Sequence, residues 1–181
     1  MNYHNLILIL KIKICEKILH KDCMELKLER YRMAGAKIGE GVRTFSPILS
    51  GESYLISVGN YVTVSTDVKF CTHDNSAIKI FKNATDFVGR ISVGANSFIG
   101  MNTIIMGGVS IPEKCIVGAG SVVTKSFDQA GSVIAGNPAK VIGNIDEIVE
   151  KKQDKAFDFR GMNQEEKRKE ILSHSERLVI K

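Results

Sequence analysis

The sequence predicts a mainly β protein, built as a parallel coil of short strands with helical segments at both ends and one inserted loop. The principal observation is an apolar residue at every sixth position in two runs of the chain. These positions are Val58, Val64, Phe70, Val93, Ile99, Ile105, Ile111, Val117 and Val123. Since roughly half the residues of an average chain are apolar, chance gives this pattern at about two in a thousand for a chosen frame. A period of six fits neither an α-helix nor simple alternation, and it indicates short straight faces joined by corners.

Glycine and small residues keep the same six-residue register. The position after the apolar anchor is occupied by Gly59, Gly94, Gly100 and Gly118. Glycine allows turn dihedrals without a Cβ clash, so these residues are expected at corners. Three faces close a triangle of about 18 residues, and successive coils stack at the spacing of neighbouring strands, roughly 4.8 Å. The predicted coils include 58–75, 93–110 and 111–128.

Residues 1–34 are predicted to form a helical cap. Apolar residues follow roughly helical spacing through KICEKILHKDCMELKLERYRMAG, and Gly35 is a suitable helix stop. A helix at this place would cover the open end of the coil, which otherwise exposes a sheet edge. The apolar run at 6–10 is too short to span a bilayer. We therefore expect no transmembrane segment and a cytoplasmic protein, with visits to a membrane surface left open.

The coils are expected to occupy residues 35–145, interrupted by an inserted loop at about 76–92, where the six-residue rhythm stops. His73 stands three places after the anchor Phe70, at an outward position immediately before this loop. Insertions in solenoids usually map to loops on one face, so the loop is expected to form a wall beside the histidine. His73 is thus the first candidate for a functional side chain.

Residues 146–181 are predicted to form a helical tail. The segment NIDEIVEKKQDK has helical character, and a second helix begins with the capping-box pattern of Asn163 and Glu166.

Composition excludes several classes of function. The net charge of +5 is too small to indicate nucleic-acid binding. The four cysteines match no zinc pattern and no compact disulfide framework, so they are expected to be free thiols in a reducing compartment. No metal site and no nucleic-acid partner are expected.

The repeat resembles the hexapeptide-repeat family, whose fold is the left-handed parallel β-helix. IVGAGSVVTKSF followed by GNPAKVIG resembles the end of the coil domain in the O-acetyltransferases of this family. ESYLISVGNYVTVSTDVKFCTHD with FIGMNTIIMGGVSI is similar to acetyltransferases of polysaccharide and sugar biosynthesis, related to the galactoside, maltose and serine acetyltransferases. This resemblance covers about residues 35–145. It implies left-handed winding, a homotrimer with active sites between subunits, and acetyl transfer from acetyl-CoA to a hydroxyl of a sugar, sugar nucleotide or polysaccharide precursor.

The same resemblance implies that His73 is the general base. An imidazole titrates near neutral pH and can take the proton of a sugar hydroxyl, which then attacks the thioester directly. Asp74 and Glu52 are each a possible partner of the base or a contact for the acceptor. A thiol mechanism through Cys71 is disfavoured. Cys71 and His73 are only two residues apart on a tight coil, which makes their geometry as a nucleophile–base pair doubtful.

Eight further residues are implied to bind acetyl-CoA. They are Gly100, Met101, Ala119, Gly120, Ser121, Thr124, Lys125 and Lys140. The first two are expected near the thioester, where a backbone N–H could hold the oxyanion. The next three flank the pantetheine arm, and the remaining three lie near the adenosine and its phosphates. The alternative interpretations are plain coil geometry for the small residues and solvated surface for the lysines.

Three alternatives compete with this function, and the second of them is disfavoured. Base-assisted attack by an amine is the same chemistry, so an N-acyltransferase acting on an amino sugar fits the same residues. A hexapeptide-repeat carbonic anhydrase needs three histidines around zinc, and the coils contain only His73. A non-catalytic solenoid that only assembles or binds is the third.

Overall fold

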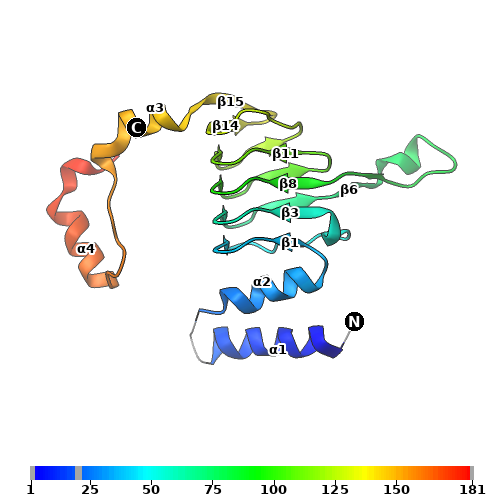
Figure 1. Ribbon diagram of the computed structural model, residues 1–181, viewed down its shortest axis with the longest axis horizontal. Helices are drawn as coiled ribbons and strands as arrows, with labels where there is room; N and C mark the ends of the chain where they lie inside the picture. Colours follow the sequence, from blue (N-terminus) through cyan, green and yellow to red (C-terminus); the bar gives the residue numbers. More distant parts are fainter. Residues whose placement is uncertain (1–2, 19–21, 180–181) are drawn as a thin grey trace.

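The computed structural model describes residues 3–18 and 22–179 of the chain. Its centre is a stack of short strands, with helices at both ends and one arm projecting sideways (Figure 1). Three sheets make up the stack, with all neighbouring strands parallel except the last pair, and the chain visits the sheets in turn. The fold is therefore mainly β with helices at both ends, as predicted.

The strands are distributed as follows. The first sheet contains, in spatial order, β1 (Lys37–Ile38), β3 (Ile56–Val58), β8 (Ile91–Val93) and β11 (Ser110–Ile111). The second contains β2 (Arg43–Thr44), β4 (Thr63–Val64), β9 (Phe98–Ile99), β12 (Ile116–Val117), β14 (Ser132–Gly136) and β15 (Ala139–Asn144), the last pair being antiparallel. The third contains β5 (Lys69–Cys71), β10 (Ile104–Met106) and β13 (Val122–Val123). A separate antiparallel hairpin consists of β6 (His73–Asp74) and β7 (Phe87–Val88).

Strand register confirms the coil length in the upper part of the stack. Ser92 pairs with Ser110 and Ile99 pairs with Val117, so partners stand 18 residues apart. All nine anchor residues point inward and are at most 5% exposed. Stacked anchors therefore form one aliphatic core through the centre of the three sheets.

Corner conformations recur with the same period. Backbone φ is positive at Asn96 (58°), Asn102 (57°), Gly108 (87°), Lys114 (57°) and Gly120 (70°), each six residues after the last. The glycines that follow the anchors have another reason to be small. A Cβ on Gly94 would lie 2.3 Å from the backbone nitrogen of Glu113, and one on Gly100 would lie 2.6 Å from that of Ala119. The expectation that these glycines supply the turns was wrong: they permit the close approach of the next coil.

Two helices lie at the N-terminal end of the stack, α1 (Tyr3–Lys17) and α2 (Met24–Met33). Leu28 and Tyr31 of α2 are buried in the central core, and the Arg32 guanidinium donates hydrogen bonds to the carbonyls of Ile38 and Gly39. Helix α2 thus covers the end of the stack beside β1. Gly35 follows this helix with φ of +98°, which is consistent with the predicted stop. Residues 1–2 and 19–21 of the predicted cap lie outside the described residues.

The arm differs in position from the predicted loop. Lys69 pairs with Ile104, 35 residues away instead of 18, so an excursion of 17 residues separates these coils. It leaves the stack at His73, where β6 begins, and β8 resumes the stack at Ile91. We call residues 73–90 the arm. The break in rhythm had indicated 76–92, because sequence periodicity does not show which residues pair within the hairpin.

The C-terminal residues form α3 (Ile145–Lys152) and α4 (Gln164–Ser173), which extend away from the stack in Figure 1. The capping box predicted at α4 is confirmed, with reciprocal hydrogen bonds between Asn163 and Glu166. Short 3₁₀ segments are η1 (Ser53–Leu55), η2 (Asn75–Lys79), η3 (Gln153–Lys155) and η4 (Ser175–Arg177). Among the described residues, none of the helices has both the length and the apolar character needed to cross a membrane.

Candidate active site

His73 stands where a corner is missing. The equivalent residues of the two preceding faces, Tyr61 and Asp67, have φ of 55° and 59° and turn the chain. His73 instead begins strand β6 and pairs with Val88, so the chain runs outward into the arm. Its side chain is 41% exposed, which agrees with the outward direction expected from the sequence.

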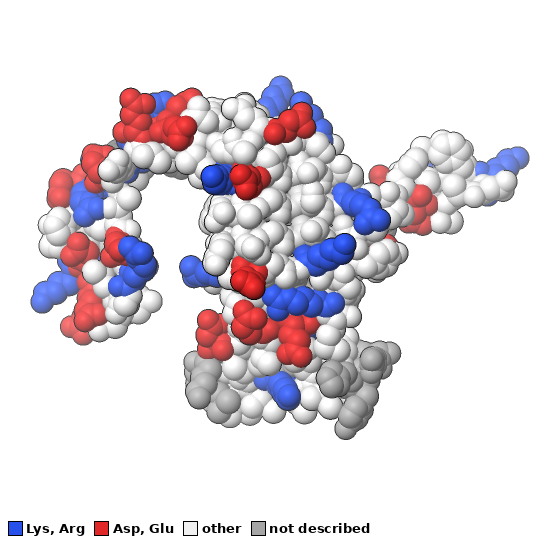
Figure 2. Space-filling model, in the orientation of Figure 1, with Lys and Arg blue, Asp and Glu red and all other residues white. Residues whose placement is uncertain are grey.

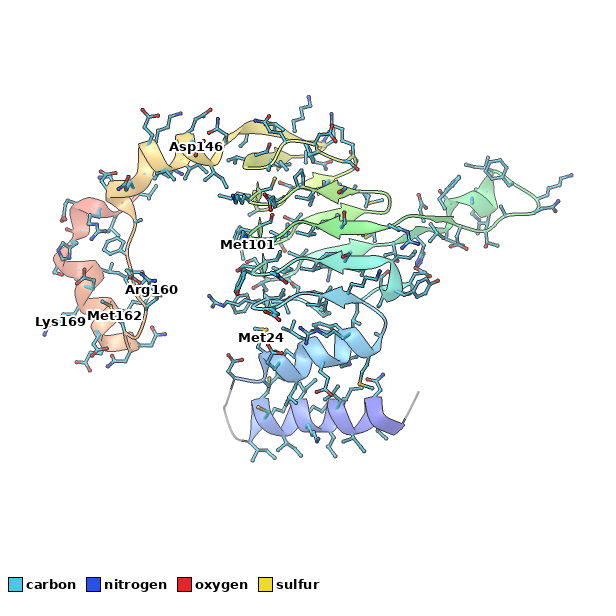
Figure 3. All side chains as sticks on the ribbon, in the orientation of Figure 1. Met24, Met101, Asp146, Arg160, Met162 and Lys169 are labelled. Atoms are coloured by element: carbon cyan, nitrogen blue, oxygen red, sulfur yellow. The ribbon has the colours of Figure 1, made fainter. Side chains whose placement is uncertain are left out.

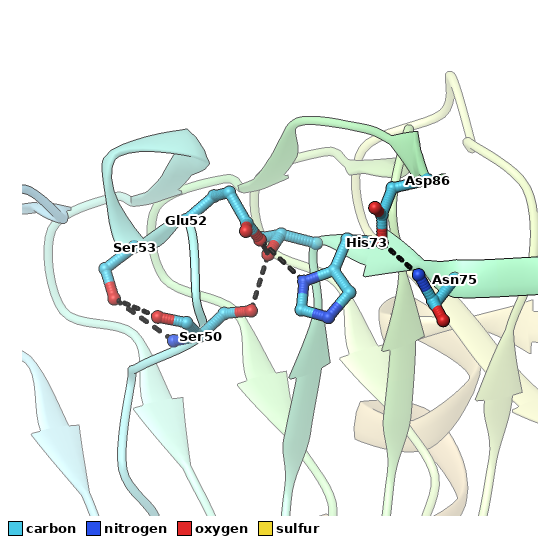
Figure 4. A network of polar contacts seen from close by, with 7 residues as sticks. Ser50, Glu52, Ser53, His73, Asn75 and Asp86 are labelled. Atoms are coloured by element: carbon cyan, nitrogen blue, oxygen red, sulfur yellow. Dashed lines mark hydrogen bonds and ion pairs between the residues drawn. The ribbon is translucent and has the colours of Figure 1, made fainter. Parts of the chain in front are cut away.

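Glu52 is the carboxylate that contacts His73. Its Oε2 lies 2.7 Å from His73 Nδ1 (Figure 4). Glu52 immediately precedes η1, and 21 residues separate it from the histidine in the sequence. One circuit of the stack therefore brings these two side chains together.

Hydroxyl groups hold the Glu52 carboxylate in place. The buried Thr72 donates a hydrogen bond from Oγ1 to Glu52 Oε2 at 2.6 Å, and Ser50 Oγ contacts the same Thr72 oxygen. Ser53 in turn donates to the Ser50 carbonyl at 2.9 Å (Figure 4). Neither Thr72 nor Ser50 could be predicted from the sequence, because the repeat does not show which residues approach one another only after coiling.

Electrostatics of the pair follow from these contacts. The Thr72 hydroxyl, and then His73, lower the pKa of the Glu52 carboxyl, so this group is an ionised acceptor. The hydrogen bond with Glu52, followed by its negative charge, raises the pKa of His73 above the ordinary value of 6.5. An ionised carboxylate only accepts hydrogen bonds, so Nδ1 of His73 is the donor. The neutral imidazole then carries its lone pair on Nε2, which is the form that a general base requires.

Asp74, the other predicted partner, has a different contact. Its carboxylate accepts a hydrogen bond from the Ser76 backbone N–H at 2.9 Å and caps η2. Beside it, the Asn75 amide donates to the Thr85 carbonyl and to Asp86 Oδ1, at 3.1 and 3.2 Å. Of the two carboxylates left open by the sequence, the structure brings Glu52 to the imidazole and directs Asp74 to the arm.

A cavity of about 290 Å³ adjoins the histidine. Its lining comes from the ends of β5 and β10 and from the arm, and includes His73, Phe87, Val88, Met106 and Gly107. The arm thus forms a wall beside His73, as the sequence predicted. The residues contributed by β7 were not predicted, because they depend on how the hairpin folds back.

Seven of the eight residues expected to bind acetyl-CoA lie at two corners of the stack, and the eighth, Lys140, lies on β15. Gly100, Met101, Ala119 and Gly120 stack in the corner between the second and third sheets, where Gly120 N–H donates to Met101 O at 2.8 Å. Met101 lies on the side of the stack facing the C-terminal helices, away from the arm (Figure 3). Ser121, in the same corner, is buried, and its hydroxyl donates to the Gly118 carbonyl at 2.6 Å.

The other three residues expected to bind acetyl-CoA lie elsewhere in the stack. Thr124 and Lys125 follow β13, which stacks on β10, so they share the corner of Met106 and Gly107. Lys140 is exposed on β15. None of the eight donor candidates lines the cavity beside His73. A single chain therefore brings the predicted base His73 together with Glu52, but not with the predicted thioester contacts.

Within residues 3–18 and 22–179, no group of three or more His, Cys, Asp or Glu side chains is placed to hold a metal ion.

Comparison with known proteins identifies the family. Residues 90–125 match the family described as hexapeptide repeat of succinyl-transferase. Protein CapG of Staphylococcus aureus is 37% identical over 167 residues, which is 89% of this chain and 94% of that protein. A putative acetyltransferase of Schizosaccharomyces pombe is 34% identical over 93 residues, 51% of this chain and 44% of that protein. The chain belongs to the hexapeptide-repeat acetyltransferases and is an acyltransferase.

Two solved structures have a similar fold. A maltose O-acetyltransferase from Clostridium difficile 630 superposes with a TM-score of 0.52 and 23% identity, covering 77% of this chain and 88% of that one. The hexapeptide-repeat acetyltransferase VCA0836 from Vibrio cholerae has a TM-score of 0.52 and 18% identity, covering 80% and 94%.

Proposed function

We propose that the protein transfers an acetyl group from acetyl-CoA to a hydroxyl of a sugar, a sugar nucleotide or a polysaccharide precursor. The observation that carries this proposal is the Glu52–His73 pair beside an open cavity. Membership of the acetyltransferase family supplies the reaction class. The motifs around His73 resemble those of sugar and polysaccharide acetyltransferases, and this resemblance supplies the acceptor class.

In the proposed mechanism His73 accepts the proton of the attacking hydroxyl on Nε2. Glu52 accepts the Nδ1–H hydrogen bond throughout, and it stabilises the imidazolium once the proton has arrived. The acceptor oxygen forms a bond to the thioester carbonyl carbon, the carbon–sulfur bond breaks, and the proton passes from His73 to the leaving thiolate. A base of this kind contributes about 10²–10⁴-fold in rate.

Of the two residues expected near the oxyanion, the geometry favours Met101. The Gly100 N–H already donates to the Val117 carbonyl at 2.8 Å, between stacked coils. Using it for the oxyanion would break that hydrogen bond. We therefore assign the oxyanion contact to the Met101 N–H, and the role of Gly100 to close stacking.

We further infer left-handed winding of the stack and a homotrimer with active sites between subunits. The donor candidates around Met101 lie away from the arm, so a neighbouring subunit would have to bring them to His73. Residues 1–34 would then act as the cap, 35–145 as the catalytic coil domain and 146–181 as a tail. The proposed compartment is the cytoplasm, where acetyl-CoA is supplied.

Turnover with a panel of acceptors tests the reaction. Release of free thiol from acetyl-CoA would be followed with sugars, amino sugars, sugar nucleotides and a lipid-linked glycan, and the product would be identified by NMR. We expect one hydroxyl acceptor to be acetylated. Acetylation at nitrogen would instead establish the N-acyltransferase. Binding of acetyl-CoA without thiol release on any member of the panel would support a non-catalytic solenoid.

A further inference from the structure

Helix α1 is apolar on two opposite faces. Leu8 and Ile12 are buried in a small cluster with Cys23, where α1 packs on α2. A second set of large aliphatic side chains is exposed instead. It consists of Leu6 (51% exposed), Leu10 (58%) and Ile14 (39%) in the helix, together with Ile18 (68%) directly after it, whose N–H donates to the Ile14 carbonyl. We call these four residues the outer stripe.

The outer stripe lies on the side of the helix turned away from α2. Its members follow one another at intervals of four residues, which places them along one face of a helix. With about 100° per residue, its centre lies about 160° around the helix from that of Leu8 and Ile12. A helix that is apolar all round is normally buried on every side. Each member of the outer stripe is at least 39% exposed, and the cluster that joins α1 to α2 in the described part of the chain includes none of them.

Positive charge borders the outer stripe. At about 100° per residue, Lys13 falls about 20° beyond Leu6 on one edge, and Lys11 falls about 20° beyond Ile18 on the other. Both lysines are exposed, as is Lys17 near the C-terminal end of α1. Glu16 is the acidic residue of this helix, and its carboxylate pairs with Lys27 of α2 at 2.6 Å.

The position of α1 leaves this face accessible. The helix is the outermost layer at one end of the stack, beyond α2, and runs across the stack axis (Figure 1). In the view of Figure 2 this end is mainly uncharged, with a row of acidic residues just above it. The exposed face of α1 therefore lies at one end of the molecule and forms no part of the cavity beside His73.

We propose that the outer stripe docks this end of the protein on an anionic lipid bilayer. The four aliphatic side chains would enter the boundary between headgroups and acyl chains, while Lys11, Lys13 and Lys17 extend to the lipid phosphates. Charge decides between this partner and a second copy of the chain. Two outer stripes packed together would bring lysines of equal charge into proximity, whereas an anionic surface complements them. In the proposed trimer three such helices would act together, which strengthens weak binding.

Flotation of the full-length protein with lipid vesicles tests this proposal. Vesicles of phosphatidylglycerol and phosphatidylcholine would be compared with vesicles of phosphatidylcholine alone. We expect binding to the anionic vesicles that weakens as salt is added. Leu10→Ser should weaken binding at least tenfold, because a buried leucine is lost from the lipid contact. Replacing Lys11 and Lys13 by Gln should weaken it about thirtyfold, at about fivefold for each lysine.

Leu172→Ser is the matched control, since Leu172 is an exposed leucine of α4 (66% exposed) and should leave vesicle binding unchanged. Absence of binding by the unaltered protein would overturn the proposal, and so would binding that Leu10→Ser leaves intact. A change in oligomeric size on Leu10→Ser, without vesicle binding by the unaltered protein, would assign the outer stripe to self-association. Acetyl transfer to a soluble acceptor should be unaffected by Leu10→Ser, so this test and that of the proposed function fail separately.

Discussion

At the scale of single residues, the site depends on a side chain that lies where the repeat is interrupted. His73 occupies a position where Tyr61 and Asp67 turn the chain, yet it starts an outgoing strand. Its imidazole is therefore held from one side by Glu52 and remains accessible on the other. The hydroxyls of Thr72 and Ser50 fix the carboxylate, so the imidazole of the proposed base is oriented before any substrate arrives.

The Glu52–His73 pair predicts the pH dependence of activity. His73 must be neutral to accept a proton, so kcat/KM should rise with pH through a pKa above 6.5, the value that Glu52 shifts upward. Glu52→Gln removes the negative charge, so this pKa should fall toward 6.5 and the limiting rate should drop at least tenfold. Rate profiles between pH 5 and 9 would show both changes.

Asp74→Asn is the matched control for that experiment. Asparagine still accepts the Ser76 N–H, so η2 keeps its cap and activity should stay within about twofold. A profile that moves with Asp74→Asn but not with Glu52→Gln would reverse the assignment of the partner.

At the scale of elements, the arm forms part of the cavity wall. Asn75 begins η2 directly after the outgoing strand β6, and its amide donates hydrogen bonds to Thr85 and Asp86, which lie just before the returning strand β7. Phe87 and Val88 then line the cavity beside His73. The arm is therefore expected to shape the acceptor pocket without taking part in proton transfer.

Asn75→Ala tests this role of the arm. Loss of the two amide hydrogen bonds should loosen the hairpin and displace the wall residues, with an expected cost of about 1–3 kcal/mol in local stability. We expect KM for the acceptor to rise about tenfold while kcat changes less. Steady-state kinetics at varied acceptor concentration separate the two, and a fall in kcat at unchanged KM would contradict this account.

Regular parts of these elements could be predicted from the sequence, and the irregular ones could not. The nine anchors repeat every six residues because every coil presents the same inward face, so the core follows directly from the period. The capping box at Asn163 is equally local. The Glu52 contact with His73 arises only when coils stack, and the limits of the arm depend on the pairing of β6 with β7. Neither leaves a periodic signal.

At the scale of the whole molecule, the proposed site needs two subunits. His73 and the cavity lie on the side of the arm, whereas Met101 lies on the opposite side of the stack (Figure 3). The corner around Met101 that works with each histidine would then belong to a second chain. A trimer would provide one such corner for every cavity.

Mixed trimers test this arrangement. His73→Ala removes the base. Ala119→Trp places a large side chain at the exposed corner beside Met101, where acetyl-CoA is expected to bind. Each variant alone should be inactive. After unfolding and refolding of an equal mixture, about a quarter of the sites would combine an intact histidine with an intact corner, so about a quarter of the original activity should return. If each site were built within a single chain, the mixture would recover no activity. Mass spectrometry of the intact refolded trimers checks that the two variants have exchanged subunits.

The most direct measurement of the central claim is thiol release from acetyl-CoA by the unaltered protein and by His73→Ala, with the acceptor found in the panel. The variant alters an exposed side chain, so its oligomeric size and unfolding transition should match those of the unaltered protein. We predict a rate lower by about 10²-fold or more, because the general base is lost. Thiol release at an undiminished rate by the folded variant would contradict the assignment of His73 as the base.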